Sequence, residues 1–463
     1  MTNQIIEPSH ADSIAAGGSD AIGGPIGRFR SSGNWWNPIR VLIALSASIY
    51  ALGYVLDLSC RNSGWVSPEN YEHLCYSDIP PLFSLRGFAD GLFPYLQTMP
   101  GQTTLEYPVL TGVFMQVAAM ITRAITNIVP STSASTVFFD VNVVLLFIPL
   151  VVAVVATALT VRRRPWDAAM FILAPGVLLA ATINWDLLPL ALVGIALLLW
   201  SRNRPVAAGL LLGLAVAAKF YPVLFLGAFL LLAIRSGKWR PLAALVGGTA
   251  LTWLMVNVPF IVGNFDGWAF FYTYSQSRGQ DFGSFWFALS ELGLPNVSND
   301  ILNTVATGCF LVLCLAIAIL VLRAKRRPRL AQLLFLIIAA FAVTNKVYSP
   351  QYVLWLIPLA VLARPKWRDF IIWQVGEIIY FVAVWWFLVG YGNADLKGLT
   401  QQWYALAIFV HIAATIYFAS MVIRDIVQPE HDPVRSDGFF EDADDPGGGP
   451  YDKAADAFTL RRA

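Results

Sequence analysis

Residues 139–161 read FDVNVVLLFIPLVVAVVATALTV and are followed at once by Arg162, Arg163 and Arg164. An apolar run of this length makes a helix of about 30 Å, which is enough to cross the hydrocarbon core of a bilayer. The run is continuously apolar and does not alternate, so a helix is expected and not a strand of a membrane barrel. The three arginines predict that this helix ends on the cytoplasmic side.

The rest of the chain has the same character. Of its 463 residues, 57% are hydrophobic and only 13% are charged, whereas soluble domains carry roughly 25% charged residues. We therefore predict an all-α integral membrane protein, a polytopic bundle of about 12 transmembrane helices. The predicted spans are 40–57, 139–161, 167–183, 187–200, 206–220, 222–234, 241–262, 302–322, 330–344, 351–363, 370–390 and 404–423.

Basic residues mark one side of this bundle. They cluster in short loops at 162–164, 202–204, 235–240, 323–329 and 364–368. The positive-inside rule assigns these loops to the cytoplasm, and both termini with them. The remaining loops then face outward, and the longest of these is the first, residues 58–108. Residues 109–128 are apolar enough to span, but a span there would move 162–164 outside. We therefore predict a re-entrant or interfacial helix; the alternative is a thirteenth span with an outside N-terminus.

The two ends of the chain are polar and differ from the region between them. Residues 1–38 are rich in Gly and Ser, and residues 426–463 contain an acidic stretch near Asp445. Both are predicted to be disordered cytoplasmic tails around a transmembrane domain at 39–425. Cys60 and Cys75 lie in the first outer loop, and if that loop is extracytoplasmic a disulfide between them is favoured.

Polar side chains gather at the predicted outer ends of the helices. Such residues are costly at membrane depth unless they share a cavity or have partners. Each one alone also has a structural explanation, since a lysine can snorkel to the interface and an Asn or Asp can cap a helix. Their common level favours a shared cavity on the outer side. The group comprises Asn184, Asp186, Lys219, Tyr221, Lys346, Tyr348 and Gln351, below a first loop that carries Asp78, Arg86, Asp90 and Glu106.

Several kinds of chemistry have no residues to carry them. The sequence contains four histidines and no HExxH motif, no Cys/His metal spacing and no Walker-type glycine loop. Zinc-dependent hydrolysis and ATP-driven pumping are therefore not expected, and no metal site or cofactor is predicted. Whether a metal assists the chemistry stays open.

The order of motifs resembles a known family. The first loop reads Ser77-Asp78-Ile79, then Arg86-Gly87, Asp90-Gly91-Leu92-Phe93-Pro94-Tyr95 and Glu106-Tyr107-Pro108-Val109-Leu110. Asn184-Trp185-Asp186, Ala217-Ala218-Lys219-Phe220-Tyr221-Pro222, Arg278 with Asp281-Phe282-Gly283-Ser284-Phe285-Trp286, and Tyr348-Ser349-Pro350-Gln351-Tyr352 follow. Over residues 40–425 this pattern resembles polyprenol-phosphate-sugar glycosyltransferases of the GT-C fold, family 87, which includes actinobacterial α-mannosyltransferases. Val109 departs from that pattern, because the family has a second proline there.

The resemblance implies a reaction and roles for residues. A sugar, mannose by this resemblance, would pass from polyprenyl phosphate to a glycolipid or cell-envelope glycan outside the plasma membrane. The first-loop aspartate of the family, which corresponds to Asp78, would act as general base, with Asp90 and Asp57 as weaker candidates. A cation should stabilise the departing phosphate. The candidates are Lys219, Lys346, Arg278 and Arg86, and Tyr107, Tyr348 and Trp286 could pack against the sugar or the isoprenoid.

Other functions compete with this one. An arabinofuranosyltransferase of the same fold would use the same residues. A lipid or sugar transporter or flippase would suit about 12 spans, but transporters generally show repeats and broken helices near the midplane. No repeat is evident in this sequence, and the polar residues lie at one face of the bundle. A non-catalytic scaffold would not need clustered carboxylates and cations. The acceptor, the linkage and the oligomeric state cannot be read from the sequence.

Overall fold

The computed structural model describes residues 12–22, 35–97, 104–130, 133–295, 297–391, 395, 397–436 and 444–460, and these contain helices and loops but no strand. The helices are α2 (Ser13–Ile22), α3 (Pro38–Ser63), α4 (Glu69–Glu72), α5 (Ile79–Leu85), α6 (Val109–Ile128), α7 (Ala134–Thr160), η1 (Pro165–Asp167), α8 (Ala168–Ile172), α9 (Pro175–Ala180), α10 (Leu187–Ser201), α11 (Pro205–Ala218), η2 (Tyr221–Leu224), α12 (Phe225–Ser236), α13 (Trp239–Gly263), α14 (Phe265–Ser277), α15 (Phe285–Glu291), α16 (Asn299–Arg323), α17 (Leu330–Thr344), η3 (Pro350–Tyr352), α18 (Val353–Ala363), α19 (Trp367–Gly390), α20 (Gln401–Val427), η4 (Pro429–His431) and η5 (Gly449–Tyr451).

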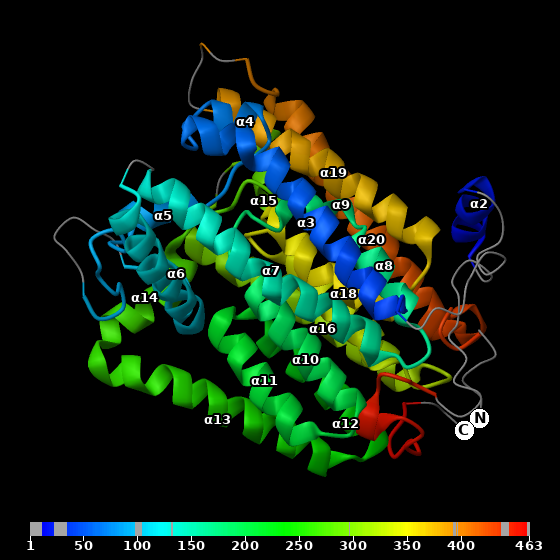
Figure 1. The fold of residues 1–463 in the computed structure, drawn as a ribbon. Helices are drawn as coiled ribbons and strands as arrows, with labels where there is room; N and C mark the ends of the chain where they lie inside the picture. Colours follow the sequence, from blue (N-terminus) through cyan, green and yellow to red (C-terminus); the bar gives the residue numbers. More distant parts are fainter. Residues whose placement is uncertain are drawn as a thin grey trace.

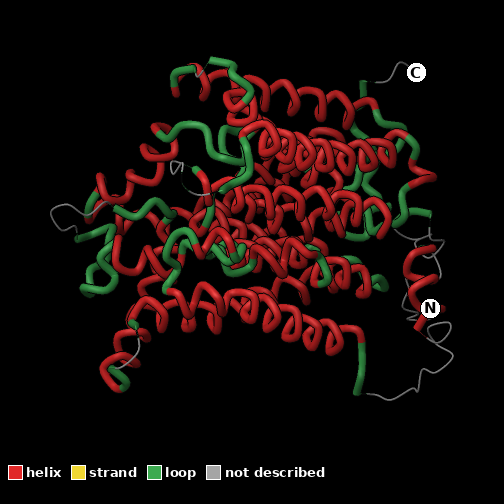
Figure 2. Tube along the Cα trace, turned by 90° about the horizontal axis from the view of Figure 1, so that it is seen from above, coloured by secondary structure: helices red, strands yellow, loops and turns green. Residues whose placement is uncertain are grey.

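The long helices run in roughly one direction, with loops gathered at both ends (Figures 1 and 2). Among the described residues, seven helices are long and apolar enough to cross a membrane, and five apolar helices are shorter. The chain is thus a helical membrane protein. α6, for which a re-entrant or interfacial position is predicted, is one of the seven by length and composition, and it lies at an angle to α7 near one end of the bundle (Figure 1).

One predicted span is wrong. Residues 167–183 do not form a continuous helix, because α8 ends at Ile172 and α9 begins at Pro175. Ala174 between them is extended, with φ −63° and ψ 125°. The residue before a proline is driven out of the helical region by the proline ring, so Pro175 divides this apolar run into two short helices.

Glycines bring α11 unusually close to α13. A Cβ added to Gly209 would lie 2.2 Å from the Leu245 carbonyl oxygen, and one added to Gly213 would lie 2.4 Å from that of Thr249. Small residues allow backbones to approach in this way in membrane helix pairs. A hydroxyl then fixes the far end of α11, where Thr111 of α6 donates to the Ala218 carbonyl at 2.6 Å. Lys219, the next residue, is thereby held in a defined place.

Buried ion pairs close one end of the bundle, which we call the basic end (Arg164, Arg235, Arg329, Arg364 and residues 444–460). Arg329 binds both carboxylate oxygens of Asp432, at 2.7 and 2.9 Å. Arg235 pairs with Asp456 at 2.7 Å, and the Tyr451 hydroxyl donates to the Phe229 carbonyl at 2.9 Å. These partners all come from the C-terminal segment, which crosses the ends of several helices.

The terminal segments therefore differ from the predicted tails. Residues 428–436 and 444–460 pack on the bundle and are not the disordered segment that their composition suggested, because their carboxylates neutralise arginines that the bundle buries. Near the N-terminus, residues 13–22 form α2, and the Asp12 carboxylate accepts a hydrogen bond from the Trp367 backbone at 3.0 Å. The other parts of the predicted tails, 1–11, 23–34, 437–443 and 461–463, lie outside the described residues.

Candidate functional site

The opposite end of the bundle, which we call the site end, carries α4, α5, α6, α14 and α15 (Figure 1). The first loop is attached there by a covalent bond and by hydrogen bonds. A disulfide joins Cys60, near the end of α3, to Cys75, with the sulfur atoms 2.12 Å apart. Ser77 donates its hydroxyl to the Thr182 carbonyl at 2.7 Å, and the Asp78 backbone N–H donates to the Ile183 carbonyl at 2.8 Å. Asp78 is thus fixed against the segment that leads into α10.

Two tyrosines hold the Asp78 carboxylate. The Tyr76 hydroxyl donates to Oδ1 at 2.7 Å, and the Tyr107 hydroxyl donates to Oδ2 at 3.3 Å. Burial raises the pKa of Asp78 from 3.8 to about 6, while the Tyr76 hydrogen bond and the charge of Lys219 act in the opposite direction. A carboxylate of this kind is ionised at neutral pH and more basic than a surface aspartate, which suits a general base.

Lys219 lies next to the ring of Tyr107. Its Nζ atom is 2.7 Å from Asp186 Oδ1 and 5.1 Å from the centre of the Tyr107 ring. Asp186 is 1% exposed, whereas Lys219 is 16% exposed, so the ammonium group is the accessible member of the pair. The other oxygen of Asp186 accepts a hydrogen bond from Trp355 Nε1 at 3.1 Å.

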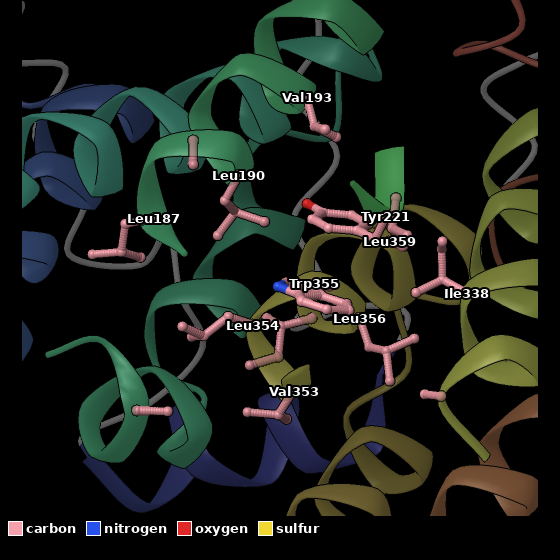
Figure 3. Close-up of a cluster of buried hydrophobic side chains, with 14 of the residues drawn as sticks. Leu187, Leu190, Val193, Tyr221, Ile338, Val353, Leu354, Trp355, Leu356 and Leu359 are labelled. Atoms are coloured by element: carbon pink, nitrogen blue, oxygen red, sulfur yellow. The ribbon is translucent and has the colours of Figure 1, made fainter. Parts of the chain in front are cut away.

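Aromatic rings pack against the Lys219–Asp186 ion pair. Tyr221 stacks on Trp355 with the ring centres 4.3 Å apart and nearly parallel, and both belong to a buried apolar cluster with Leu356 and Leu359 (Figure 3). Trp355 also stacks on Tyr352, at 3.7 Å. This packing excludes water from one side of Lys219, and a low-dielectric surrounding strengthens the attraction of an ammonium group for an anion.

A second charged group lies in the loop after α14. Arg278 pairs with Asp281 at 2.8 Å, and Ser349 donates its hydroxyl to the other Asp281 oxygen at 2.9 Å. Burial raises the pKa of Asp281, and Arg278 and Ser349 partly offset this effect. The charge of Arg278 reaches the hydroxyls of Tyr107 and Tyr352, so this group adjoins the Asp78 and Lys219 region.

Lys346 binds backbone carbonyl groups at the end of α14. Its Nζ donates to the carbonyl oxygens of Gln276 and Arg278 at 3.0 and 2.6 Å, which lie at the C-terminal end of α14. Cations are stabilising at that end of a helix, because its last carbonyls lack partners. Burial, followed by the nearby Arg278, lowers the pKa of Lys346.

Other predicted residues are engaged with one another or turned away. Arg86 binds Glu106 through two hydrogen bonds of 2.7 and 2.8 Å. Asp90 is exposed, in the turn after α5. Tyr348 is fully buried, its hydroxyl 3.1 Å from Thr415 Oγ1 and its ring 4.1 Å from that of His411, so it faces the contact between α19 and α20.

The remaining candidates adjoin the same region. Asn184 accepts a hydrogen bond from the Asp186 backbone at 3.0 Å, Gln351 is 9% exposed, and Asp57 accepts a hydrogen bond from Thr182 at 2.7 Å. The Trp286 indole donates to the Thr344 carbonyl at 3.0 Å. Among the described residues, no group of three His, Cys, Asp or Glu side chains is arranged to hold a metal ion.

Sequence reasoning missed two contributors. Tyr76 lies two residues before Asp78, and that proximity is the signal that could have identified it. Trp355 lies inside a continuously apolar run, where no local feature distinguishes a site residue from core packing.

Comparisons with known proteins give one family match and two more distant similarities. The model of glycosyltransferase family 87 matches residues 106–344, which include Asp186, Lys219 and Arg278 but not Asp78. GPI mannosyltransferase 1 of Kluyveromyces lactis is 26% identical over 236 residues, which cover 47% of this chain and 58% of that protein. A crystal structure of ArnT from Cupriavidus metallidurans bound to undecaprenyl phosphate aligns with 86% of this chain and 78% of its own, at 15% identity and a TM-score of 0.45. Because the family model matches more than half of the chain, this protein belongs to glycosyltransferase family 87.

Proposed function

We propose that this enzyme transfers a sugar, mannose in the first instance, from polyprenyl phosphate to a glycan or glycolipid acceptor at the outer face of the membrane. One observation carries the proposal. A half-buried carboxylate of raised pKa, Asp78, and an accessible ammonium group, Lys219, both lie next to the same tyrosine, Tyr107, Asp78 at its hydroxyl and Lys219 at its ring. A base and a cation close to one another are what a transfer from a sugar phosphate requires.

The chemistry follows from these two groups. Asp78 accepts the proton of an acceptor hydroxyl as the hydroxyl oxygen attacks the anomeric carbon of the donor sugar. The bond from that carbon to the phosphate oxygen breaks, and its electron pair leaves with the polyprenyl phosphate. Lys219 stabilises the negative charge that gathers on this oxygen, and Arg278 is a second cation close by. The reaction needs no nucleotide, because the phosphate is already a good leaving group.

The side of the membrane follows from the charges. The basic end carries the arginine loops that the positive-inside rule assigns to the cytoplasm, so the site end would face outward, with both termini inside. Mannose is favoured because the mannosyltransferase of Kluyveromyces lactis is named for that sugar and aligns with 47% of this chain. Arabinofuranose is the second choice, from the family resemblance. Because the alignment covers 58% of that protein, its acceptor is not carried over.

The decisive experiment replaces Asp78 by Asn and measures the transfer of radiolabelled mannose from polyprenyl-phosphate mannose in membranes. We expect transfer to fall by at least about a hundredfold, the usual contribution of general base catalysis. The folded pKa of Asp78 lies above 3.8, so its ionised form costs stability above about pH 6, and removing the charge should not reduce abundance at pH 7.

Asp300 provides the matched control, because it is exposed in the first turn of α16. Asp300→Asn should transfer sugar at the unaltered rate. Near-normal turnover by purified Asp78→Asn would show that Asp78 is not the base. The same assay run with polyprenyl-phosphate arabinofuranose decides between the two sugars, and transfer of neither sugar by the wild-type protein would contradict the proposed function.

A further inference from the structure

The two oxygens of Asp78 face different surroundings. Tyr107, which hydrogen-bonds to Oδ2, lies next to Lys219 and its partner Asp186, where the proposed donor phosphate would lie. Tyr76, on Oδ1, instead stacks on Trp385 of α19, and the charge that acts on it besides that of Asp78 is Asp281. A general base must reach the acceptor hydroxyl directly. Because the Tyr107 side belongs to the donor, the acceptor has to approach Asp78 from the Tyr76 side.

Three stacked aromatic rings lie on that side. Tyr76 stacks on Trp385 of α19 with the ring centres 4.7 Å apart, and Tyr71 of α4 stacks on both, at 5.8 Å from Tyr76 and 6.1 Å from Trp385. The planes lie within 27° of one another. Tyr71 and Tyr76 are partly exposed, whereas Trp385 is buried behind them. We call this group the aromatic platform (Tyr71, Tyr76 and Trp385). In Figure 1, α4 lies over the site end of α19.

Two buried polar atoms of this region have no hydrogen-bond partner within the described chain. The indole Nε1 of Trp385, a donor, belongs to a residue that is 4% exposed, and Oδ1 of Asn70, an acceptor, belongs to one that is 6% exposed. Buried polar groups in native proteins are nearly always hydrogen-bonded, and leaving one unpaired destabilises the protein. A ligand hydroxyl can both accept from an indole N–H and donate to an amide oxygen.

These observations combine into one assignment. We propose that the aromatic platform binds a sugar ring of the acceptor glycan, with its apolar face on the rings of Tyr71 and Tyr76 and its hydroxyls turned toward Trp385 and Asn70. Ligand sites are commonly lined by aromatic rings with a few polar groups that fix orientation. One acceptor hydroxyl then lies beside Asp78 Oδ1. The inference rests on the proposed function, because it takes Asp78 to be the base.

The test uses the full chain in lipid nanodiscs, with polyprenyl-phosphate mannose as donor and octyl α-mannoside or octyl α-dimannoside as acceptor. Tyr71→Leu keeps an apolar side chain but removes the ring. We expect it to raise the acceptor KM about tenfold, which corresponds to about 1.4 kcal/mol and lies at the upper end of an aromatic contact, and to leave the donor KM within about twofold. Tyr71→Phe keeps the ring and should retain the wild-type acceptor KM. Trp385→Phe, which removes only the N–H, should raise the acceptor KM by a smaller factor.

Trp403 is the matched control, since it is a 63% exposed aromatic residue in the first turn of α20, and Trp403→Leu should change neither KM. An unaltered acceptor KM in Tyr71→Leu, or an equal rise in Tyr71→Phe, would overturn the assignment.

Calorimetric binding of octyl α-mannoside without donor separates this inference from the proposed function. Asp78→Asn should bind the mannoside as the wild type does and fail to transfer, whereas Tyr71→Leu should bind about tenfold more weakly. If Asp78→Asn still transfers sugar, Asp78 is not the base. The binding measurements with Tyr71→Leu would still test whether the aromatic platform binds the acceptor. Absence of mannoside binding to the wild-type protein at millimolar concentrations would contradict the platform itself.

Discussion

The two ends of the bundle use charged residues in opposite ways. At the basic end, Arg329 is 2% exposed, binds both oxygens of a fully buried Asp432, and donates to the Leu362 and Ala363 carbonyls as well. At the site end, Lys219 has one carboxylate partner, and Asp78 is held by two tyrosine hydroxyls. Saturated pairs hold helices together, whereas the proposed base and cation, whose hydrogen bonding is incomplete, are left able to bind a substrate.

The largest effect is expected from breaking a saturated pair. Asp432→Ala leaves the Arg329 guanidinium buried without its counter-charge, which should reduce the free energy of unfolding by about 3–5 kcal/mol. Thermal unfolding in detergent measures this loss. The double variant Arg329→Met with Asp432→Leu buries no charge and should recover much of the stability. A single variant as stable as the wild type would mean that the C-terminal segment does not hold this end.

The next largest effect is expected from the disulfide that fastens the first loop at the site end. Cys75→Ser opens the disulfide to Cys60, 15 residues away, and the loop-entropy relation predicts a loss of about 3 kcal/mol. Cys314→Ser removes a free thiol and serves as the control. We expect Cys75→Ser to unfold at a lower temperature than the wild type and Cys314→Ser to unfold at the wild-type temperature. If Cys75→Ser unfolds at the same temperature as the wild type, packing alone and not the disulfide stabilises the site end.

Removing the accessible cation should impair the donor. Lys219→Gln loses a charged hydrogen bond to phosphate, so kcat/KM for the donor should fall by at least about tenfold. Asp186 would then be left as an unpaired buried charge, and the double variant Lys219→Gln with Asp186→Asn separates misfolding from lost binding. The double variant should be as abundant as the wild type and still be poor with the donor. A normal kcat/KM in both variants would remove Lys219 from the phosphate site.

The smallest effect concerns the pH dependence. The proposed reaction needs ionised Asp78, whose pKa is about 6, so kcat/KM should rise with pH through that value and then level off. Tyr76→Phe removes a hydrogen bond to the ionised carboxylate, which raises the pKa of Asp78, and the rising limb should move to higher pH by about one unit at most. Tyr54→Phe, whose hydroxyl bonds Asp140, should leave the profile in place.

The sequence predicted long-range features best where one rule applies to the whole chain. Hydropathy gave the long helices to within a few residues, and the basic loops predicted a shared level for Asp186 and Lys219, which the structure brings into contact. It failed where the outcome depends on a partner far away in the chain. The composition of the acidic C-terminal segment predicts disorder, because the buried arginines that it pairs with lie far away in the sequence. Lys346 was predicted to bind phosphate, because its contact with the end of α14 cannot be read from the sequence. The break at Pro175 was visible in the sequence but was outweighed by the apolar run around it.

The disulfide between Cys60 and Cys75 also bears on how the protein is made. Cysteines pair in oxidising compartments and stay reduced in the cytosol. A chain inserted with its first loop outside would acquire the bond next to Tyr76, one residue beyond Cys75, and so fasten the segment that carries Asp78, the proposed base. A chain inserted the other way round would keep two free thiols and a loosely held Asp78. Correct insertion and a competent site are thus coupled, and the oxidation state of two cysteines reports the orientation of the whole molecule.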